Sequence, residues 1–125
     1  MEPWERVGQA TAPDGQPLEL MRRGHEWRIR AGGTELMSSE DEPSSRSLAS
    51  LGCAHLAPNA EARVLVGGLG MGFTLREALD RVGPASEVEI VELVPEVVAW
   101  NEGPLGPLAE HPLRDARVQV HVGDV

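Results

Sequence analysis

The sequence predicts an α/β protein in which a small N-terminal antiparallel β-sheet is followed by the first half of a parallel sheet. Residues 4–39 contain short apolar runs separated by Gly, Pro and Asp, a pattern typical of β-hairpins. From Arg63 onward the pattern changes to strand, helix, strand, helix, strand, which indicates parallel strands joined by helical crossovers. We therefore expect two domains, residues 1–40 and residues 41–125.

The N-terminal part is expected to form four strands, whose sequences are WERVGQATA, PLELMRR, EWRIRA and TELMSS. Apolar and polar residues alternate along the middle two strands, so one face of this sheet should pack and the other should meet water. The residues predicted to pack are Leu18, Leu20, Trp27 and Ile29.

A helix is expected to open within residues 40–47, where Pro43 suits a first-turn position and polar side chains can accept hydrogen bonds from free amides. Apolar residues and one histidine follow at helical spacing on one face, and the helix should end at 58–59. That face carries Leu48, Leu51, His55 and Leu56.

The second part should contain strands at 64–68, 88–94 and 117–125, with helices at 74–83 and from Pro95 to about Asn101. A Pro/Gly-rich connection, with at most one short helical turn, precedes the third strand. A sheet of three parallel strands buries little surface on its two faces, and doubly wound sheets normally have about five strands or more. We expect the parallel domain to be truncated, either because the chain is a fragment or because another copy or chain completes the sheet.

The composition excludes several classes of function. The 125-residue chain has a net charge of −9, and its 11 basic residues are all arginines scattered among acids, which argues against a general nucleic-acid binder. No apolar run approaches the roughly 20 residues of a membrane span, and no signal peptide is visible. The single cysteine, Cys53, rules out an internal disulfide and is typical of a reducing cytoplasm.

The glycine-rich run RVLVGGLGMG is the strongest functional signal in the sequence. Gly68, Gly70 and Gly72 form G-x-G-x-G, whereas the dinucleotide fingerprint places its third glycine where Phe73 stands. Closely spaced glycines let a loop turn sharply and let its backbone approach a ligand. The tighter spacing favours an adenosyl cofactor that carries a sulfonium and an amine-bearing tail. Glycine-rich turns between strand and helix also occur without any ligand, so a purely structural role remains open.

Two acids are predicted at the carboxyl ends of neighbouring strands. Glu92 lies twenty positions beyond Gly72, where the hydroxyls of a ribose need an acceptor. Asp124 should end the third strand beside the same crevice, where it can accept a hydrogen bond from an adenine amino group or form an Asx turn. His55 has no second ligand at metal spacing, and we predict no metal site. His121, in the middle of the third strand, is expected to be a packing or surface residue rather than a catalytic one.

These motifs resemble the spermidine synthase (polyamine aminopropyltransferase) family, whose members pair an N-terminal β-sheet with a methyltransferase-like Rossmann domain. The resemblance is strongest from Asp41 to Asp124, in Asp41-Glu42, VLVGGLGMGFTLREAL, VEIVELVPEVV and DARVQVHVGDV. It implies a transferase of polyamine biosynthesis that binds S-adenosylmethionine, decarboxylated S-adenosylmethionine or methylthioadenosine, takes an amine acceptor and forms a homodimer. The implied cofactor-binding residues are Gly68, Gly70, Met71 and Gly72 for the tail, Glu92 for the ribose and Asp124 for the adenine.

Several family positions differ in this chain. Met71 takes the place of the family's loop acid, and Ser45-Arg46-Ser47 replaces its Tyr-His-Glu run. Leu36 replaces a glutamine that touches the nucleoside, and Val94 stands where the family often has a second acid. A dicationic acceptor such as putrescine needs carboxylates and aromatic faces, so these changes predict weakened acceptor binding.

No catalytic residue is assigned, because the family's general base is an aspartate that would follow the next strand, beyond Val125. We therefore expect that this chain alone does not catalyse aminopropyl transfer. Three hypotheses remain: part of a spermidine synthase-like enzyme, a methyltransferase that shares the nucleotide site, and a non-catalytic dimerisation module. The methyltransferase hypothesis rests on Met71, because loss of the loop acid removes repulsion of the carboxylate of S-adenosylmethionine.

Overall fold

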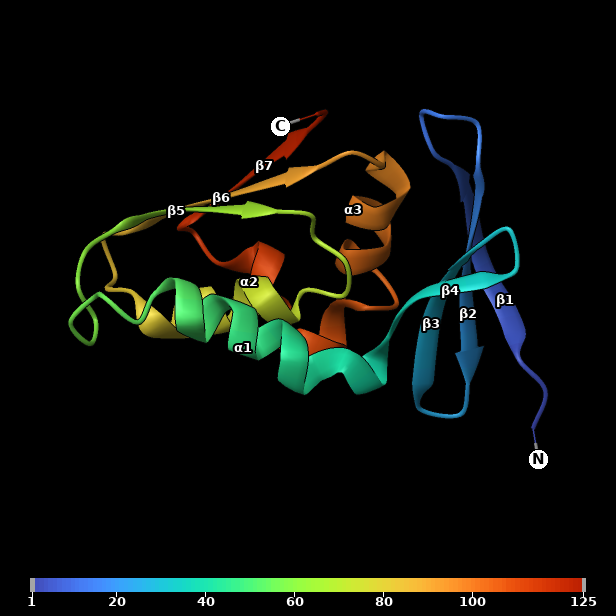
Figure 1. Cartoon of the computed structure of the whole chain (residues 1–125), viewed down its shortest axis with the longest axis horizontal. Helices are drawn as coiled ribbons and strands as arrows, with labels where there is room; N and C mark the ends of the chain where they lie inside the picture. Colours follow the sequence, from blue (N-terminus) through green and yellow to red (C-terminus); the bar gives the residue numbers. More distant parts are fainter. Residues whose placement is uncertain (1, 125) are drawn as a thin grey trace.

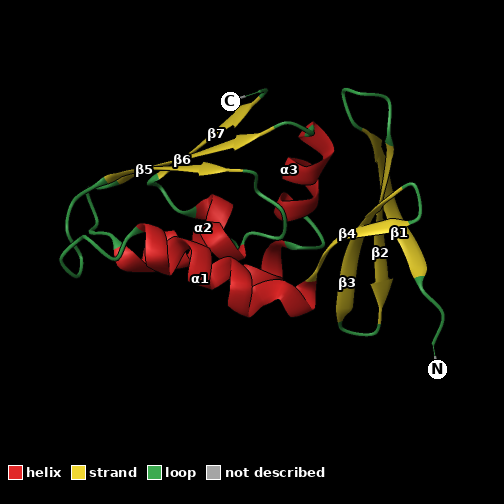
Figure 2. Ribbon diagram, viewed as in Figure 1, coloured by secondary structure: helices red, strands yellow, loops and turns green. Residues whose placement is uncertain are grey.

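The computed structural model, which describes residues 2–124, contains an antiparallel sheet and a parallel sheet separated by helices (Figures 1 and 2). The antiparallel sheet has the order β1-β2-β3-β4 and the parallel sheet has the order β5-β6-β7. Both the fold class and the order of its elements are as the sequence predicts.

The N-terminal sheet is a meander of β1 (Glu5–Thr11), β2 (Pro17–Arg23), β3 (Glu26–Ala31) and β4 (Thr34–Ser38), paired antiparallel throughout. Its inner face is the predicted one, since Leu18, Leu20, Trp27 and Ile29 are all buried. The domain boundary predicted after residue 40 stays a prediction, although the last strand of this sheet ends nearby.

A capped turn joins the sheet to the first helix. The Ser38 side chain accepts a hydrogen bond from the Glu40 amide (3.1 Å), and the Asp41 carboxylate accepts one from the Ser38 amide (2.9 Å). This reciprocal pair is a capping box, and it satisfies amides that a helix start leaves free. The short 3-10 helix η1 (Ser39–Asp41) then leads directly into α1 (Glu42–Gly52).

Helix α1 is shorter than predicted, because it ends at Gly52 rather than at 58–59. Glycine is a poor helix former, and the chain continues from there in turns that contain His55 and Leu56. The apolar stripe is also not a packed face: Leu48 and Leu51 are 66% and 76% exposed. The buried residue of α1 is the small Ala49.

The parallel sheet consists of β5 (Arg63–Gly67), β6 (Glu87–Glu92) and β7 (Val118–Val122). Helix α2 (Phe73–Arg81) connects the first pair of strands, and α3 (Pro95–Glu102) with two 3-10 helices, η2 (Gly106–Ala109) and η3 (Pro112–Arg114), connects the second pair. Figure 1 shows α1 and α2 beneath one face of this sheet, while no described helix covers the opposite face.

The two sheets share one hydrophobic core, which includes residues of β2 and β3 as well as residues of α2, α3 and the parallel strands. Trp100 of α3 lies against Gly8 of β1 so closely that a Cβ atom at Gly8 would stand 2.6 Å from the indole Nε1. The close approach of α3 to β1 therefore requires the absence of a side chain at position 8.

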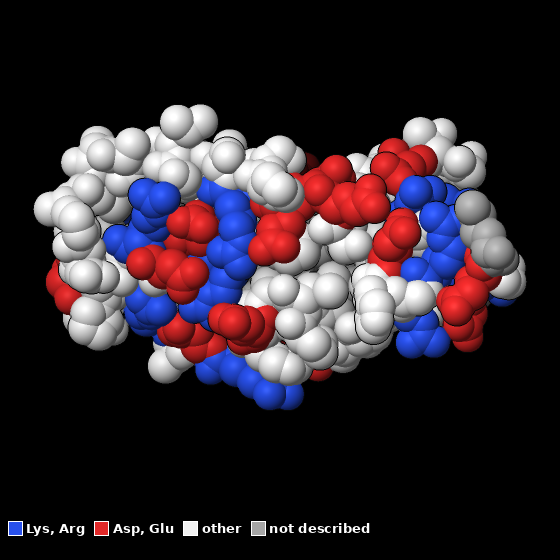
Figure 3. Space-filling model, turned by 90° about the horizontal axis from the view of Figure 1, so that it is seen from below, with Lys and Arg blue, Asp and Glu red and all other residues white. Residues whose placement is uncertain are grey.

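Arginines and acids are interspersed over the helical side of the molecule rather than separated into patches (Figure 3). Arg46 pairs with Glu42 and Glu77, and Arg81 also pairs with Glu77. No helix within residues 2–124 is both long enough and apolar enough to cross a membrane.

Candidate functional site

The glycine loop connects the end of β5 to the start of α2. Gly68 has a φ of +87°, and no atom lies within 4 Å of the Cβ that another residue would place there. Gly72 also has a φ of +87°, but its Cβ would lie 3.1 Å from Asn101 Oδ1 and 3.2 Å from Pro112 Cγ. The loop therefore presents Gly68 to open space and Gly72 to the packed interior.

Asn101, near the end of α3, fixes the middle of the loop. Its Nδ2 donates to the Gly70 carbonyl (2.7 Å) and to the Val97 carbonyl (2.9 Å), and the residue is 2% exposed. We did not predict this residue from the sequence. The available signal is that a lone amide follows the apolar run VVAW inside a helix.

Glu92 is buried at the carboxyl end of β6, and both of its carboxylate oxygens accept backbone hydrogen bonds. Oε1 accepts from the Leu69 amide at 2.8 Å, and Oε2 accepts from the Val94 amide at 3.0 Å. The acid therefore holds the glycine loop and the start of α3 together. Each carboxylate oxygen can accept a second hydrogen bond, so this structural role leaves acceptor capacity for a ligand.

Glu92 and the glycine loop line one cavity of about 240 Å³. One wall comes from the joint between the N-terminal sheet and α1, and the other comes from residues 67–74. The lining residues are Met37, Ser38, Asp41, Ser45, Gly67, Gly68, Leu69, Gly70, Met71, Phe73, Thr74 and Glu92.

The structure thus brings together four of the residues predicted for cofactor binding: Gly68, Gly70, Met71 and Glu92. Gly72 and Asp124 are not among the residues that line this cavity. Asp124 is exposed and directly follows Gly123, whose amide donates to the Glu92 carbonyl at 2.9 Å. It therefore lies at the same edge of the sheet as Glu92, outside the cavity.

The charge of the cavity is negative. Asp41 and Glu92 contribute carboxylates, and no Arg or Lys is among the lining residues. Arg46, which follows the lining residue Ser45, is held by Glu42 (2.7 Å) and Glu77 (3.3 Å), and these acids raise the pKa of its guanidinium, the hydrogen bond to Glu42 most of all. Its charge is therefore neutralised outside the cavity.

Asp41 is one of the two acids that line the cavity, and its carboxylate favours a ligand with a positive charge. The sequence placed it at a helix start, and the capping hydrogen bond to Ser38 agrees with that. Its position in the cavity wall depends on how β4 meets α1, which no local pattern encodes. Among residues 2–124, no group of three or more His, Cys, Asp or Glu side chains is arranged to hold a metal ion.

Comparison with known proteins identifies the fold. No protein-family model and no curated protein matches the sequence. A spermidine synthase solved in complex with the transition state analogue AdoDATO superposes with a TM-score of 0.71 and 19% identity, covering 95% of this chain and 41% of that chain. The chain has the fold of a spermidine synthase N-terminal portion.

Other spermidine synthase structures agree. The enzyme from Thermotoga maritima gives a TM-score of 0.71 at 19% identity, with 95% of this chain and 40% of that chain covered. A probable spermidine synthase from Corynebacterium glutamicum gives 0.52 at 20% identity, with 96% and 45% covered. The spermidine synthase-like chain thus spans about two fifths of the length of the structures it matches.

Proposed function

We propose that this chain binds an adenosyl cofactor at its glycine loop, as the N-terminal part of a spermidine synthase-like protein. The observation that carries the proposal is that Gly68, open on its ligand side, and the carboxylate of Glu92 line one cavity. A strand-end acid beside a glycine-rich turn is the arrangement with which α/β folds hold a ribose.

The size of the cavity limits which part of the cofactor it receives. At about 240 Å³ it is smaller than the roughly 300–1,000 Å³ of pockets that enclose a whole drug-sized ligand. It fits the ribose and the sulfonium tail, with the adenine extending along the strand ends towards Asp124. Asp124 at that edge supports this orientation, since its carboxylate can accept a hydrogen bond from the adenine amino group.

The charge of the cavity favours a cationic tail. Asp41 and Glu92 attract the sulfonium and ammonium groups of decarboxylated S-adenosylmethionine, whereas the carboxylate of S-adenosylmethionine would meet two acids and no base. This supports the aminopropyltransferase-like hypothesis over the methyltransferase hypothesis. Asp41 provides a carboxylate from the wall opposite the loop, where Met71 provides none.

In the complete protein, the bound cofactor would supply the aminopropyl group for transfer to an amine. The residues of this chain would bind and orient it: Glu92 accepts from the ribose, the loop backbone follows the tail, and Asp41 holds the terminal ammonium. We further propose that the protein works as a homodimer in the cytoplasm.

Calorimetric titration tests the proposal. We expect decarboxylated S-adenosylmethionine to bind most tightly, methylthioadenosine next and S-adenosylmethionine most weakly. Glu92→Ala should abolish binding, whereas Glu89→Ala, on the outer face of the same strand, should leave it unchanged. No heat from any of the three compounds would reject the proposal, and tightest binding of S-adenosylmethionine would favour a methyltransferase. A dimer without cofactor binding would favour the dimerisation module.

The proposed role of Asp41 has its own test. Asp41→Asn should reduce the preference for decarboxylated over carboxylated cofactor about tenfold, because the amide keeps the shape of the side chain and removes its charge. Glu40→Gln is the matched control, since Glu40 is exposed and does not line the cavity. An unchanged preference in Asp41→Asn would assign this residue to capping alone.

A further inference from the structure

Met37, in β4, differs in its exposure from the other methionines that the structure describes. Met21 and Met71 are buried, at 6% and 4% exposed, whereas Met37 is only partly buried. Met37 and Met71 both line the cavity of about 240 Å³ at the glycine loop. Because a reagent must reach a side chain in order to modify it, Met37 is the methionine of residues 2–124 that is most open to reagents in solution.

A β-bulge places Met37 on the inner face of the N-terminal sheet. The pairing of β3 with β4 shifts its register between Ile29 and Arg30. Met37 consequently stands opposite the buried Ile29, and Leu36, which is 54% exposed, is the extra residue of the bulge. Bulges re-aim side chains in this way, and this one turns the Met37 thioether towards the core and the cavity.

The Met37 sulfur lies directly on the backbone of the glycine loop. Gly70 has a φ of +54°, and a Cβ placed there would stand 3.1 Å from the Met37 Sδ and 3.2 Å from its Cε. The Gly70 carbonyl accepts a hydrogen bond from Asn101 Nδ2 at 2.7 Å. Gly70 is therefore held by two elements, β4 through the thioether and α3 through the amide.

Oxidation of a methionine changes such a contact in a defined way. A thioether is apolar and flexible, whereas its sulfoxide is polar and chiral at sulfur. An oxygen on the loop side of Met37 would have no room beside Gly70, and an oxygen on the other side would project into the cavity. The loop contact or the space for a ligand is altered in either case.

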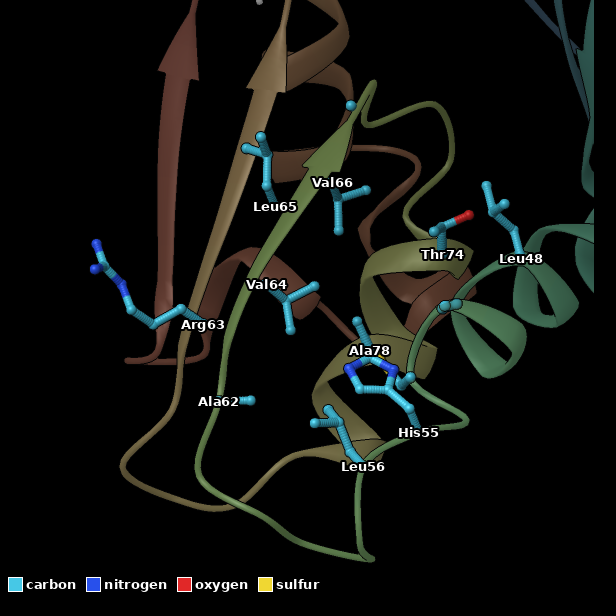
Figure 4. Close-up of a pocket in the computed structure, with 14 residues that line it drawn as sticks. Leu48, His55, Leu56, Ala62, Arg63, Val64, Leu65, Val66, Thr74 and Ala78 are labelled. Carbon is cyan, nitrogen blue, oxygen red and sulfur yellow. The ribbon is translucent and has the colours of Figure 1, made fainter.

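The single cysteine, Cys53, lies at a different place. It lines the cavity of about 400 Å³ between α1 and β5, and none of the described residues that line that cavity is a methionine (Figure 4). Cys53 is 6% exposed and does not line the cavity at the glycine loop. An effect of an oxidant on the loop is therefore expected to come from Met37 rather than from Cys53.

We propose that Met37 is an oxidation site at which hydrogen peroxide releases the glycine loop from β4 and lowers the affinity of the cavity for its ligand. A lone pair of Sδ attacks one peroxide oxygen, the O–O bond breaks and an S–O bond forms. The sulfur loses two electrons, and the second oxygen leaves as water with both protons. The effect on the loop stands by itself, whereas the effect on affinity rests on the cofactor binding proposed above.

Peptide mapping locates the oxidation. Trypsin cleaves after arginine and the chain has no lysine, so Met21, Met37 and Met71 fall in the separate peptides 7–22, 31–46 and 64–76. We expect peroxide to add one oxygen atom to peptide 31–46 at least about tenfold faster than to the other two. Uniform oxidation of the three peptides, or earlier modification of peptide 47–63, which contains Cys53, would overturn the proposal.

Hydrogen exchange measures the effect on the loop without any ligand. The amides of Gly68, Leu69 and Gly72 are hydrogen-bonded, and oxidation should speed their exchange at least about tenfold. Met37→Leu keeps an apolar side chain of similar volume without sulfur, so peroxide should not change loop exchange in this variant. Met21→Leu, at a buried methionine of the same sheet, is the matched control and should respond to peroxide as the parent chain does. Loop exchange that peroxide leaves unchanged in the parent, or changes equally in Met37→Leu, would overturn the proposal.

Calorimetric titration separates this proposal from the proposed function. Decarboxylated S-adenosylmethionine should bind the oxidised chain about tenfold more weakly than the reduced chain, and methionine sulfoxide reductases should restore the affinity. If the reduced chain binds no adenosyl compound, the proposed function fails, and loop exchange then decides the role of Met37. Tight binding that is equal in the oxidised and reduced chains would reject the regulation by Met37.

Discussion

Gly72 is the loop glycine at which an added side chain would meet the packed interior. Its left-handed backbone costs a residue with a side chain about 1–2 kcal/mol, and a Cβ would press on Asn101 and Pro112. We expect Gly72→Ala to lower the free energy of unfolding by at least about 2 kcal/mol in urea titrations. Gly67→Ala is the control, since Gly67 has ordinary φ and open space, and it should be nearly neutral. Equal effects would contradict this account of the loop.

Asn101 holds the middle of the glycine loop through its side-chain amide. Asn101→Ala removes the hydrogen bonds to the Gly70 and Val97 carbonyls and leaves the Gly70 carbonyl without this partner. We expect a loss of about 1–3 kcal/mol in unfolding free energy, together with faster amide exchange across residues 68–72. Gln119→Ala, at an exposed position of β7, should change neither quantity. A stable variant with an unchanged loop would show that Asn101 does not hold it.

At the scale of elements, one arginine joins β7 to α2. The Arg117 guanidinium donates to the carbonyls of Leu79 and Val82, both at 3.0 Å, and to the Asp115 carboxylate at 2.8 Å. The hydrogen bond from Arg117 lowers the pKa of Asp115 from 3.8 to about 2, against the opposing effect of burial. The charge of Asp115 thus keeps Arg117 in place at the carboxyl end of the helix.

The ion pair between Asp115 and Arg117 predicts that the free energy of unfolding depends on pH. Because the folded-state pKa of Asp115 is depressed, its stabilisation is complete above the unfolded pKa of 3.8 and is lost as pH falls towards 2. Asp115→Asn should cost about 2 kcal/mol at pH 6, and the difference should shrink to about half by pH 3. Urea titrations at several pH values measure it, with Glu102→Gln as an exposed control. A difference independent of pH would assign the effect to packing rather than to charge.

Local sequence patterns predicted the elements well and their environment less well. The strands and α2 were predicted because apolar periodicity and turn residues are local signals. The stripe of Leu48 and Leu51 has the spacing of a buried face, yet it is exposed, because periodicity does not reveal whether a neighbour is present. The end of α1 was missed for a related reason: apolar spacing continued through His55 and Leu56 after Gly52 had ended the helix.

In the candidate site too, the features encoded by local sequence were predicted, and those that depend on tertiary packing were not. The glycine loop and Glu92 were predicted together, because a turn and the end of the next strand have fixed places in an α/β unit. Met37, Asp41 and Asn101 come from other elements, so their positions follow from tertiary packing. The direction of Gly72, towards the interior, depends on the loop conformation and was not predictable from glycine spacing.

At the scale of the whole molecule, the contact between Gly8 and Trp100 couples the two sheets. Gly8→Val would force a side chain into the indole ring, which is itself buried, and should cost about 1–3 kcal/mol. Near-ultraviolet circular dichroism should show that the tryptophan environment changes, and urea titration should give the loss of stability. Gly52→Ala, where no atom lies within 4 Å, should be neutral or slightly stabilising. An unaffected Gly8→Val variant would mean that the sheets are not coupled here.

The capping box at the end of β4 has a mechanical consequence. Ser38 and Asp41 belong both to the joint between the sheets and to the wall of the cavity, while the glycine loop forms the opposite wall. A small molecule held between these walls would act as a cross-link across the joint. Stretching single molecules by their ends should therefore need a larger rupture force when the cavity is filled.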